Sequence, residues 1–228
     1  MGGYVARPAE GGPHPGLLVF MEIFGINAHI RDVTERAARE GYVALAPDYF
    51  HRTGPGIELG YDDAGMQKGM GLLGKLVADE MIADARAALA YLRGRADTTQ
   101  KAGCMGFCIG GHMAYLTACE TDVAATASYY GGGIAAPQGP GGAPSTVSRT
   151  PKIRGRIECY FGAKDAMIPK EQVDAVRKAL DAAGTRGEVV VYDADHGFNC
   201  DQRESHHEPS ARDAWQRAFA MFREELSA

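Results

Sequence analysis

The sequence predicts a single α/β domain, built from a mostly parallel central sheet with helices on both faces. Two observations predict this class: short apolar runs of strand length alternate with longer amphipathic segments, and no internal repeat or linker divides the 228 residues. We therefore expect one domain over residues 1–228. The apolar runs that we expect to be buried strands are Leu17–Met21, Tyr42–Ala46, Ala102–Met105, Ala124–Tyr130, Ile157–Phe161 and Val189–Tyr192.

The segments between these runs carry apolar residues at three- and four-residue spacing, which predicts helices. The expected helices are about Ile30–Glu40, Val77–Arg93, Gly111–Ala118, Pro169–Ala183 and Ser210–Leu226. Two long stretches lack the pattern: Phe50–Leu76 is rich in glycine, and Gly131–Gly155 in glycine and proline. Both leave the carboxyl edge of the predicted sheet, where ligands bind in such folds. We expect these two stretches either to cover a site or to be surface insertions without a role.

Composition restricts the class of partner. The chain is 45% hydrophobic and 23% charged, and its formal net charge is −5 with the positive residues scattered. This argues against binding to nucleic acid or to an anionic membrane, and favours a small-molecule substrate. No apolar stretch approaches the roughly 20 residues of a membrane span, and the N-terminus lacks the order of a secretory signal, so we expect a cytoplasmic protein.

The cysteines and histidines do not form a metal-binding pattern. Five cysteines make an odd number without CxxC spacing, which indicates reduced thiols rather than disulfides or a zinc site. The histidines and glutamates of residues 204–208 are better explained as a solvated polar loop. We expect neither a metal nor a cofactor.

The segment Gly106-Phe-Cys-Ile-Gly110 lies between a predicted strand and a predicted helix, which is the pattern of a nucleophile elbow with cysteine in place of serine. Unpaired N–H groups and the helix dipole at this position favour the thiolate of Cys108. The N–H of Ile109 is placed to hold the oxyanion of a tetrahedral intermediate. The alternative is a buried structural cysteine.

A thiol nucleophile needs a base, and the base needs a group that orients it. His196 follows the last predicted strand, where the order nucleophile, acid, histidine places the base. Asp165 follows the strand Ile157–Phe161 and is our choice for the orienting acid. Asp193 and Asp195 are alternatives, although they lie close to His196 in sequence.

With these residues in place, the chain resembles the dienelactone hydrolase family, whose members have an α/β-hydrolase fold and a Cys-His-Asp triad. The motifs that carry the resemblance are Met21–Arg31 (MEIFGINAHIR), Gly41–Tyr49 (GYVALAPDY), Gly106–Gly111 (GFCIGG), Tyr129–Gly132 (YYGG), Gly162–Asp165 (GAKD) and His196–Phe198 (HGF). They run over nearly the whole chain. The resemblance implies a carboxymethylenebutenolidase-like enzyme with Cys108, His196 and Asp165 as its triad.

The resemblance also implies a role for Glu22, because the glutamate of this motif interacts with the catalytic cysteine and helps to form the thiolate when substrate binds. From the residues alone, Glu22 is a carboxylate at a strand end that could equally cap a helix or lie on the surface. By the same resemblance, the N–H of Ile23 would be the second oxyanion donor.

The sequence departs from the family in its arginines. Family members that take dienelactone bind the substrate carboxylate with two arginines, but Cys200 stands where one would align, and no arginine lies between Arg52 and Arg86. Arg203 could substitute for the first if its loop shifts. The candidate substrate-binding residues are Arg203, Cys200, Phe198 and Tyr130.

The N-terminus is short: only Met1–Pro8 precede the turn into the first clear buried strand. We therefore expect the N-terminal hairpin common in this fold to be abbreviated, which could expose a sheet edge. Pairing with a second copy is one remedy, so the expected state is a monomer or a small homo-oligomer.

The predicted activity is hydrolysis of a small lactone or activated carboxylic ester through a thioester on Cys108. Two alternatives remain at this point. The same nucleophile could serve an acyltransferase, or Cys108 could be a redox-sensing thiol on a protein without turnover.

Overall fold

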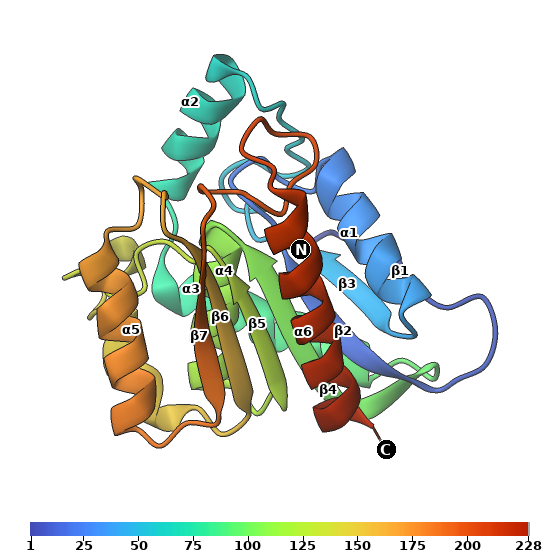
Figure 1. The fold of residues 1–228 in the computed structure, drawn as a ribbon. Coiled ribbons are helices and arrows are strands. Elements are labelled where there is room, and N and C mark those ends of the chain that lie inside the picture. The colour runs from blue at the N-terminus through green and yellow to red at the C-terminus, as the bar shows by residue number, and fades with distance from the viewer. Residues whose placement is uncertain (228) are drawn as a thin grey trace.

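The computed structural model describes residues 1–227, which form one seven-stranded sheet flanked by helices (Figure 1). The strand order is β1-β3-β2-β4-β5-β6-β7, and all neighbours are parallel except β1 and β3. The strands are β1 (Gly3–Ala6), β2 (His14–Phe20), β3 (Val43–Pro47), β4 (Thr98–Phe107), β5 (Ala125–Tyr129), β6 (Arg156–Gly162) and β7 (Gly187–Tyr192). The predicted α/β class is confirmed, and each predicted apolar run coincides with a strand.

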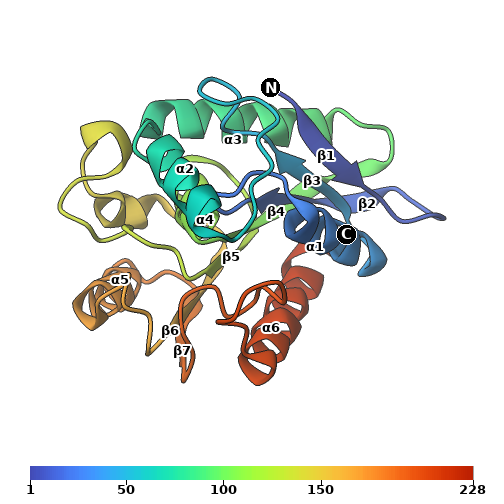
Figure 2. The same cartoon turned by 90° about the horizontal axis from the view of Figure 1, so that it is seen from above.

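Helices cover both faces of the sheet. Those of the structure are α1 (Ala28–Arg39), α2 (Asp63–Leu73), α3 (Ala78–Arg93), α4 (Ile109–Glu120), α5 (Lys170–Ala182) and α6 (Glu208–Leu226). Helices α1 and α6 lie on one face, and α3, α4 and α5 on the other (Figure 2). Each of the five predicted helices is present. Within residues 1–227, none of the helices has the length and apolar character needed to cross a bilayer.

Helix α4 lies at the centre of the fold. Its residues Ile109–Cys119 are all buried, so it has no solvated face, as expected for a helix enclosed by other elements. It packs on β4 and β5 and is covered by the 3-10 helix η2 (Thr146–Lys152). This enclosure fixes the position of the turn that precedes α4.

Residues 50–76, which we predicted to be irregular, contain the helix α2. The side chain of Asp62 caps it by accepting a hydrogen bond from the N–H of Gly65 at 2.8 Å. Three glycines within the helix weaken its periodicity, which is why the sequence pattern did not predict it. At Gly69 a Cβ would lie 2.8 Å from the carbonyl oxygen of Ile23, so the glycine allows α2 to pack closely on the turn after β2. The stretch 131–155 likewise contains η1 (Pro140–Gly142) as well as η2.

The abbreviated N-terminal region forms the single four-residue strand β1. It pairs antiparallel with β3 rather than with β2, so residues 1–20 form no hairpin. Strand β1 therefore lies at one edge of the sheet and β7 at the other.

The turn between β4 and α4 depends on two glycines. A Cβ at Gly106 would lie 2.0 Å from the carbonyl oxygen of Gly110, and a Cβ at Gly110 would lie 2.3 Å from that of Phe20. These are backbone atoms of the central strands and of α4, which cannot rotate away as a flexible side chain can. Only glycine therefore lets α4 begin so close to β2.

We predict that Gly110→Ala lowers the free energy of unfolding by about 3 kcal/mol, because the methyl group meets backbone that cannot retreat. Gly71→Ala on α2 is the matched control, since a Cβ there meets nothing within 4 Å. That change should instead stabilise the protein by about 0.5–1 kcal/mol. Urea denaturation of the two variants measures both effects, and equal midpoints would contradict the prediction.

Candidate active site

Cys108 lies in the turn between β4 and α4 in a strained backbone conformation, with φ 57° and ψ −121°. Its N–H donates to the carbonyl oxygen of Tyr129 on β5 at 3.1 Å, which helps to hold the turn. Its side chain is partly exposed and borders a pocket. The buried cysteines are Cys104, Cys119, Cys159 and Cys200. Of the five thiols, the structure thus presents Cys108 to the pocket.

The two residues predicted to donate N–H groups to the oxyanion, Ile109 and Ile23, each lie just after the end of a strand. Ile109 is the first residue of α4 and borders the pocket, and N–H groups in the first turn of a helix have no acceptor within the helix. Ile23 lies in the turn after β2 and is buried. The helix dipole adds a partial positive charge at Ile109. This end of α4 therefore suits a developing negative charge.

His196 and Asp165 come together from the loops after β7 and β6. Nδ1 of His196 lies 2.7 Å from Oδ2 of Asp165, and Oδ1 of Asp165 accepts the N–H of Met167 at 2.8 Å. The alternative acids lie elsewhere: Asp193 is exposed and pairs with Lys164, while Asp195 accepts the backbone N–H of His196. The hydrogen bond to Asp165 leaves Nε2 as the nitrogen available for proton transfer.

The surroundings of His196 favour its protonated form. Burial by itself lowers the pKa of His196, but the hydrogen bond to Asp165 and the interaction with the Cys108 thiol outweigh burial and raise the pKa to about 10. An imidazolium of this kind stabilises a neighbouring thiolate. Nε2 has no hydrogen-bond partner within residues 1–227.

Glu22 is buried at the end of β2 and is held by two side chains. Nη1 of Arg203 donates to its Oε1, and the hydroxyl of Tyr61 to its Oε2, each at 3.3 Å. The guanidinium of Arg203 also lies 5.8 Å from the ring centroids of Phe24 and Tyr61. A buried carboxylate requires such partners to offset its loss of hydration. No hydrogen bond joins Glu22 to Cys108 among the described residues.

The four candidate substrate-binding residues lie behind the pocket rather than in its wall. Arg203 is engaged with Glu22, and Cys200, Phe198 and Tyr130 are fully buried. The ring of Tyr130 packs against His196 at 5.1 Å and against Phe198 at 5.2 Å between centroids. In this arrangement the aromatic pair supports the histidine.

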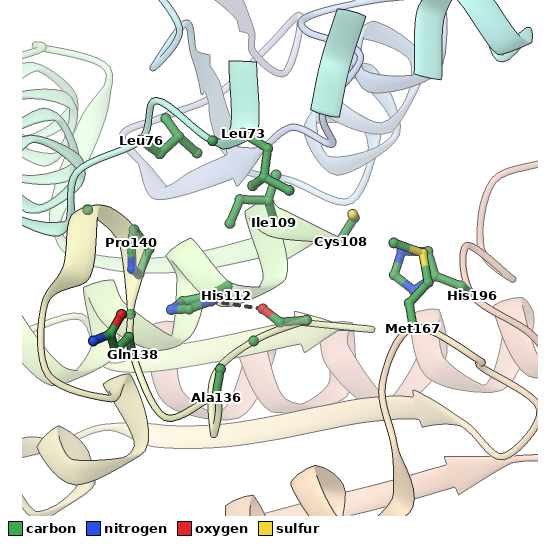
Figure 3. A pocket seen from close by; sticks show the side chains of 15 residues that line it. Leu73, Leu76, Cys108, Ile109, His112, Ala136, Gln138, Pro140, Met167 and His196 are labelled. Atoms are coloured by element: carbon green, nitrogen blue, oxygen red, sulfur yellow. Dashed lines mark hydrogen bonds between the residues drawn. The ribbon is translucent and has the colours of Figure 1, made fainter. Parts of the chain in front are cut away.

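The pocket beside Cys108 has a volume of about 390 Å³, within the range of small-molecule sites (Figure 3). Its walls come from the end of α2, the first turn of α4, and the loops after β5, β6 and β7. The residues that line it are Leu73, Gly74, Leu76, Cys108, Ile109, His112, Gly132, Gly133, Ala136, Gln138, Gly139, Pro140, Gly141, Met167 and His196. Both long stretches of the sequence therefore contribute to the pocket wall.

His112 is a pocket residue for which the sequence offered no partner. Its Nδ1 bonds the carbonyl oxygen of Gly132 at 2.8 Å, and its Nε2 bonds the hydroxyl of Thr146 at 2.7 Å (Figure 3 shows the first). Burial lowers the pKa of His112 to about 4, so the ring is neutral. It ties the loop after β5 to α4. Only the fold of residues 131–155 brings these partners together, so no local sequence signal marks them.

Among residues 1–227, Glu22, His29 and Cys200 offer ligand atoms within 4.8 Å of one another. The Arg203 guanidinium already bonds Glu22 there and places a positive charge beside the group. That charge disfavours a divalent cation, so we assign no metal to these residues.

The fold and the thiol displayed at the end of β4 define the class of protein: an α/β hydrolase. A model of the dienelactone hydrolase family matches residues 1–226, and the chain belongs to that family.

Proteins of similar sequence and a similar solved structure support this family assignment. The chain is 41% identical over 227 residues to a "Putative carboxymethylenebutenolidase" of Synechocystis, covering 98% of this chain and 92% of that protein. It is 30% identical over 233 residues to the carboxymethylenebutenolidase of Rhodococcus opacus, covering 98% and 86%. A crystal structure named as a "Putative Dienelactone Hydrolase" of Klebsiella pneumoniae superposes with a TM-score of 0.87 at 35% identity, covering 96% of this chain and 91% of the other.

We predict that Asp165→Asn lowers the pKa of His196, because the charged partner is lost. The pKa of His196 is about 6.5 in the unfolded chain and about 10 in the folded protein. Protonation of His196 therefore stabilises the fold fully below about pH 6.5, and this stabilisation is lost as the pH rises through about 10. The stability difference between wild type and variant should therefore be largest between about pH 5 and 6.5 and shrink toward pH 10.

Urea unfolding across this pH range, with a histidine NMR titration, measures the effect. Asp193→Asn is the matched control, because Asp193 is exposed and bonds Lys164 rather than the imidazole. A stability difference for Asp165→Asn that does not change with pH, or that matches the control, would contradict the assignment.

Proposed function

We propose that the protein hydrolyses small lactones or activated carboxylic esters through a thioester on Cys108. The observation that carries the proposal is that Cys108 and His196 border one pocket while Nδ1 of His196 is held by Asp165. A nucleophile, a base and a group that orients the base are the components of acyl transfer by covalent catalysis. The names of the relatives support a lactone or ester as substrate.

The reaction proceeds in two balanced steps. The Cys108 thiolate attacks the carbonyl carbon, the oxyanion is held by the N–H groups of Ile109 and Ile23, and the C–O bond breaks as His196 protonates the leaving alkoxide. His196 then takes a proton from water, the hydroxide attacks the thioester, and the C–S bond breaks to regenerate the thiolate. In a lactone the leaving alkoxide remains part of the product, which is a hydroxy acid.

Glu22 has a supporting role in this proposal. It is the group that helps to form the thiolate when substrate binds, as in the enzymes that the motif resembles. In the structure, the Glu22 carboxylate contacts Arg203 and Tyr61. The binding of substrate must weaken these contacts before the carboxylate can reach Cys108.

The two alternative functions make different predictions. An acyltransferase would pass the acyl group to an added alcohol or amine in preference to water. A redox-sensing thiol would be oxidised at Cys108 but would hydrolyse no ester. Product analysis with and without an acceptor separates both from the hydrolase.

We predict that Cys108→Ala lowers kcat/KM for aryl esters and lactones by about 10⁴-fold or more, because removal of the nucleophile leaves only binding and the oxyanion donors. Cys119→Ala on the same helix, at a buried cysteine, is the control and should change kcat/KM by less than about threefold. Steady-state hydrolysis of a panel of lactones and aryl esters measures this. Equal activity of the Cys108 variant and wild type would refute the nucleophile assignment.

A further inference from the structure

His29 on α1 is a buried histidine whose ring makes no hydrogen bond within residues 1–227. Its side chain is 1% exposed, and neither Nδ1 nor Nε2 has a partner in that part of the chain. A neutral imidazole offers one donor and one acceptor, and leaving both unsatisfied in the interior costs stability. A buried polar group of this kind indicates a role beyond packing.

His29 lies between the buried carboxylate of Glu22 and the surface carboxylate of Asp201. One of its ring nitrogens lies within 4.8 Å of a carboxylate oxygen of Glu22. Its Nδ1 lies 3.6 Å from Oδ1 of Asp201, whose side chain is 60% exposed. A side-chain rotation or one bridging water closes separations of this size. The ring is therefore within reach of the carboxylate proposed to act on Cys108 and of a second carboxylate at the surface.

The charges around His29 leave the ring neutral but able to take a proton. Burial lowers the pKa of His29, whereas the carboxylates of Glu22 and Asp201 raise it. The charged and titratable groups that face the ring lie on three elements: Glu22 after β2, Asp32 and Arg36 on α1, and Cys200 and Asp201 in the loop after β7. Arg36 opposes a positive charge on the ring and Asp32 favours it. Burial raises the pKa of Cys200 to about 11, so this group remains a thiol.

A Glu22 carboxyl that has taken the thiol proton is neutral and no longer forms an ion pair with Arg203. The side chain of Arg203 is only 15% exposed. A buried guanidinium without an anionic partner is costly, so the proton is better placed elsewhere. Its transfer to a neutral base beside Glu22 restores the ion pair.

We propose that His29 takes the thiol proton from Glu22 and holds it while Cys108 is acylated. The inference rests on the proposed function and adds a residue to it. The S–H bond of Cys108 breaks as an O–H bond forms on Glu22, and that bond breaks as an N–H bond forms on His29, beside Asp201. After hydrolysis of the thioester, the proton returns to Sγ by the same route. Because His29 acts through Glu22, it is a positioning residue rather than a catalytic one.

His29→Gln tests the proposal, because the amide keeps a polar side chain but cannot carry the proton. In this variant kcat/KM for p-nitrophenyl acetate at about pH 7.5 should fall by about tenfold. Alkylation of Cys108 by iodoacetamide without substrate should keep its rate within about twofold, since the pair of His196 and Asp165 is unchanged. A merely structural role would lower both rates together.

The pH profile gives a second readout. Since His29 must be neutral to accept the proton, kcat/KM should fall as the pH decreases through the pKa of His29, which lies below 6.5. Asp201→Asn removes a charge that favours the imidazolium, so it should move this acid limb to lower pH by about 0.5 unit. The shift should be absent when His29→Gln is also present. Asp193→Asn is the matched control, because Asp193 is exposed in the same loop and pairs with Lys164.

The outcomes separate this inference from the function on which it rests. Unchanged kcat/KM in His29→Gln overturns it, and so does an equal loss of alkylation and hydrolysis. An acid limb that Asp201→Asn moves no further than Asp193→Asn, or a shift that persists in the double variant, overturns it as well. If His29→Gln does not fold, the comparison of the two surface variants decides. Hydrolysis that persists unchanged in Cys108→Ala overturns the thioester chemistry instead.

Discussion

The close approach of α4 to the central strands is the constraint on which the site depends. Gly110 brings the first turn of the helix against the carbonyl oxygens of Phe20 and Met21, so closely that a Cβ would overlap both. Because β2 and β4 are neighbours, the turns after both strands meet at this point. Cys108, Ile109 and Ile23 are therefore positioned by one backbone contact rather than by separate side-chain interactions.

The same contact explains the electrostatic character of the site. A thiol at the beginning of a buried helix faces unpaired N–H groups in a region of low dielectric, where the dipole has a larger effect than in water. The Asp165–His196 pair adds a protonatable ring from the loops after β6 and β7. Glu22 is kept apart from Cys108 by Arg203 and Tyr61. In the proposed mechanism, His196 is thus a base that Asp165 keeps oriented, and Glu22 is a carboxylate whose partners must change before it can take part.

Most of the fold, and the residues of the candidate site, could be predicted from the sequence because their signals are local. Runs such as Leu17–Met21 are buried on both faces of a parallel sheet, and the elbow around Cys108 carries its own glycines. Helix α2 escaped prediction because Gly69 allows a close tertiary contact with Ile23, and Gly65 a close local contact with Gly60, at the expense of helical periodicity. The edge strand β1 escaped because it is four residues long and only half-buried.

The pocket wall could not be predicted, because its residues come from segments far apart in the sequence. The pairing of Arg203 with Glu22 spans 181 residues, and the bonds of His112 reach into a loop without regular structure. The contacts of Arg203, a candidate ligand for substrate, with Glu22 and two aromatic rings could likewise not be predicted. Such long-range contacts leave no periodic trace in a sequence.

The most direct test of the covalent mechanism is the mass of the protein during turnover. Wild-type protein is mixed with excess p-nitrophenyl acetate, quenched in acid within the first turnovers and digested for mass spectrometry. The account predicts one added acetyl group, removable by hydroxylamine, on the peptide that contains Cys108. Steady turnover without an acyl group on the protein, or with the acyl group on another residue that lines the pocket, would contradict it.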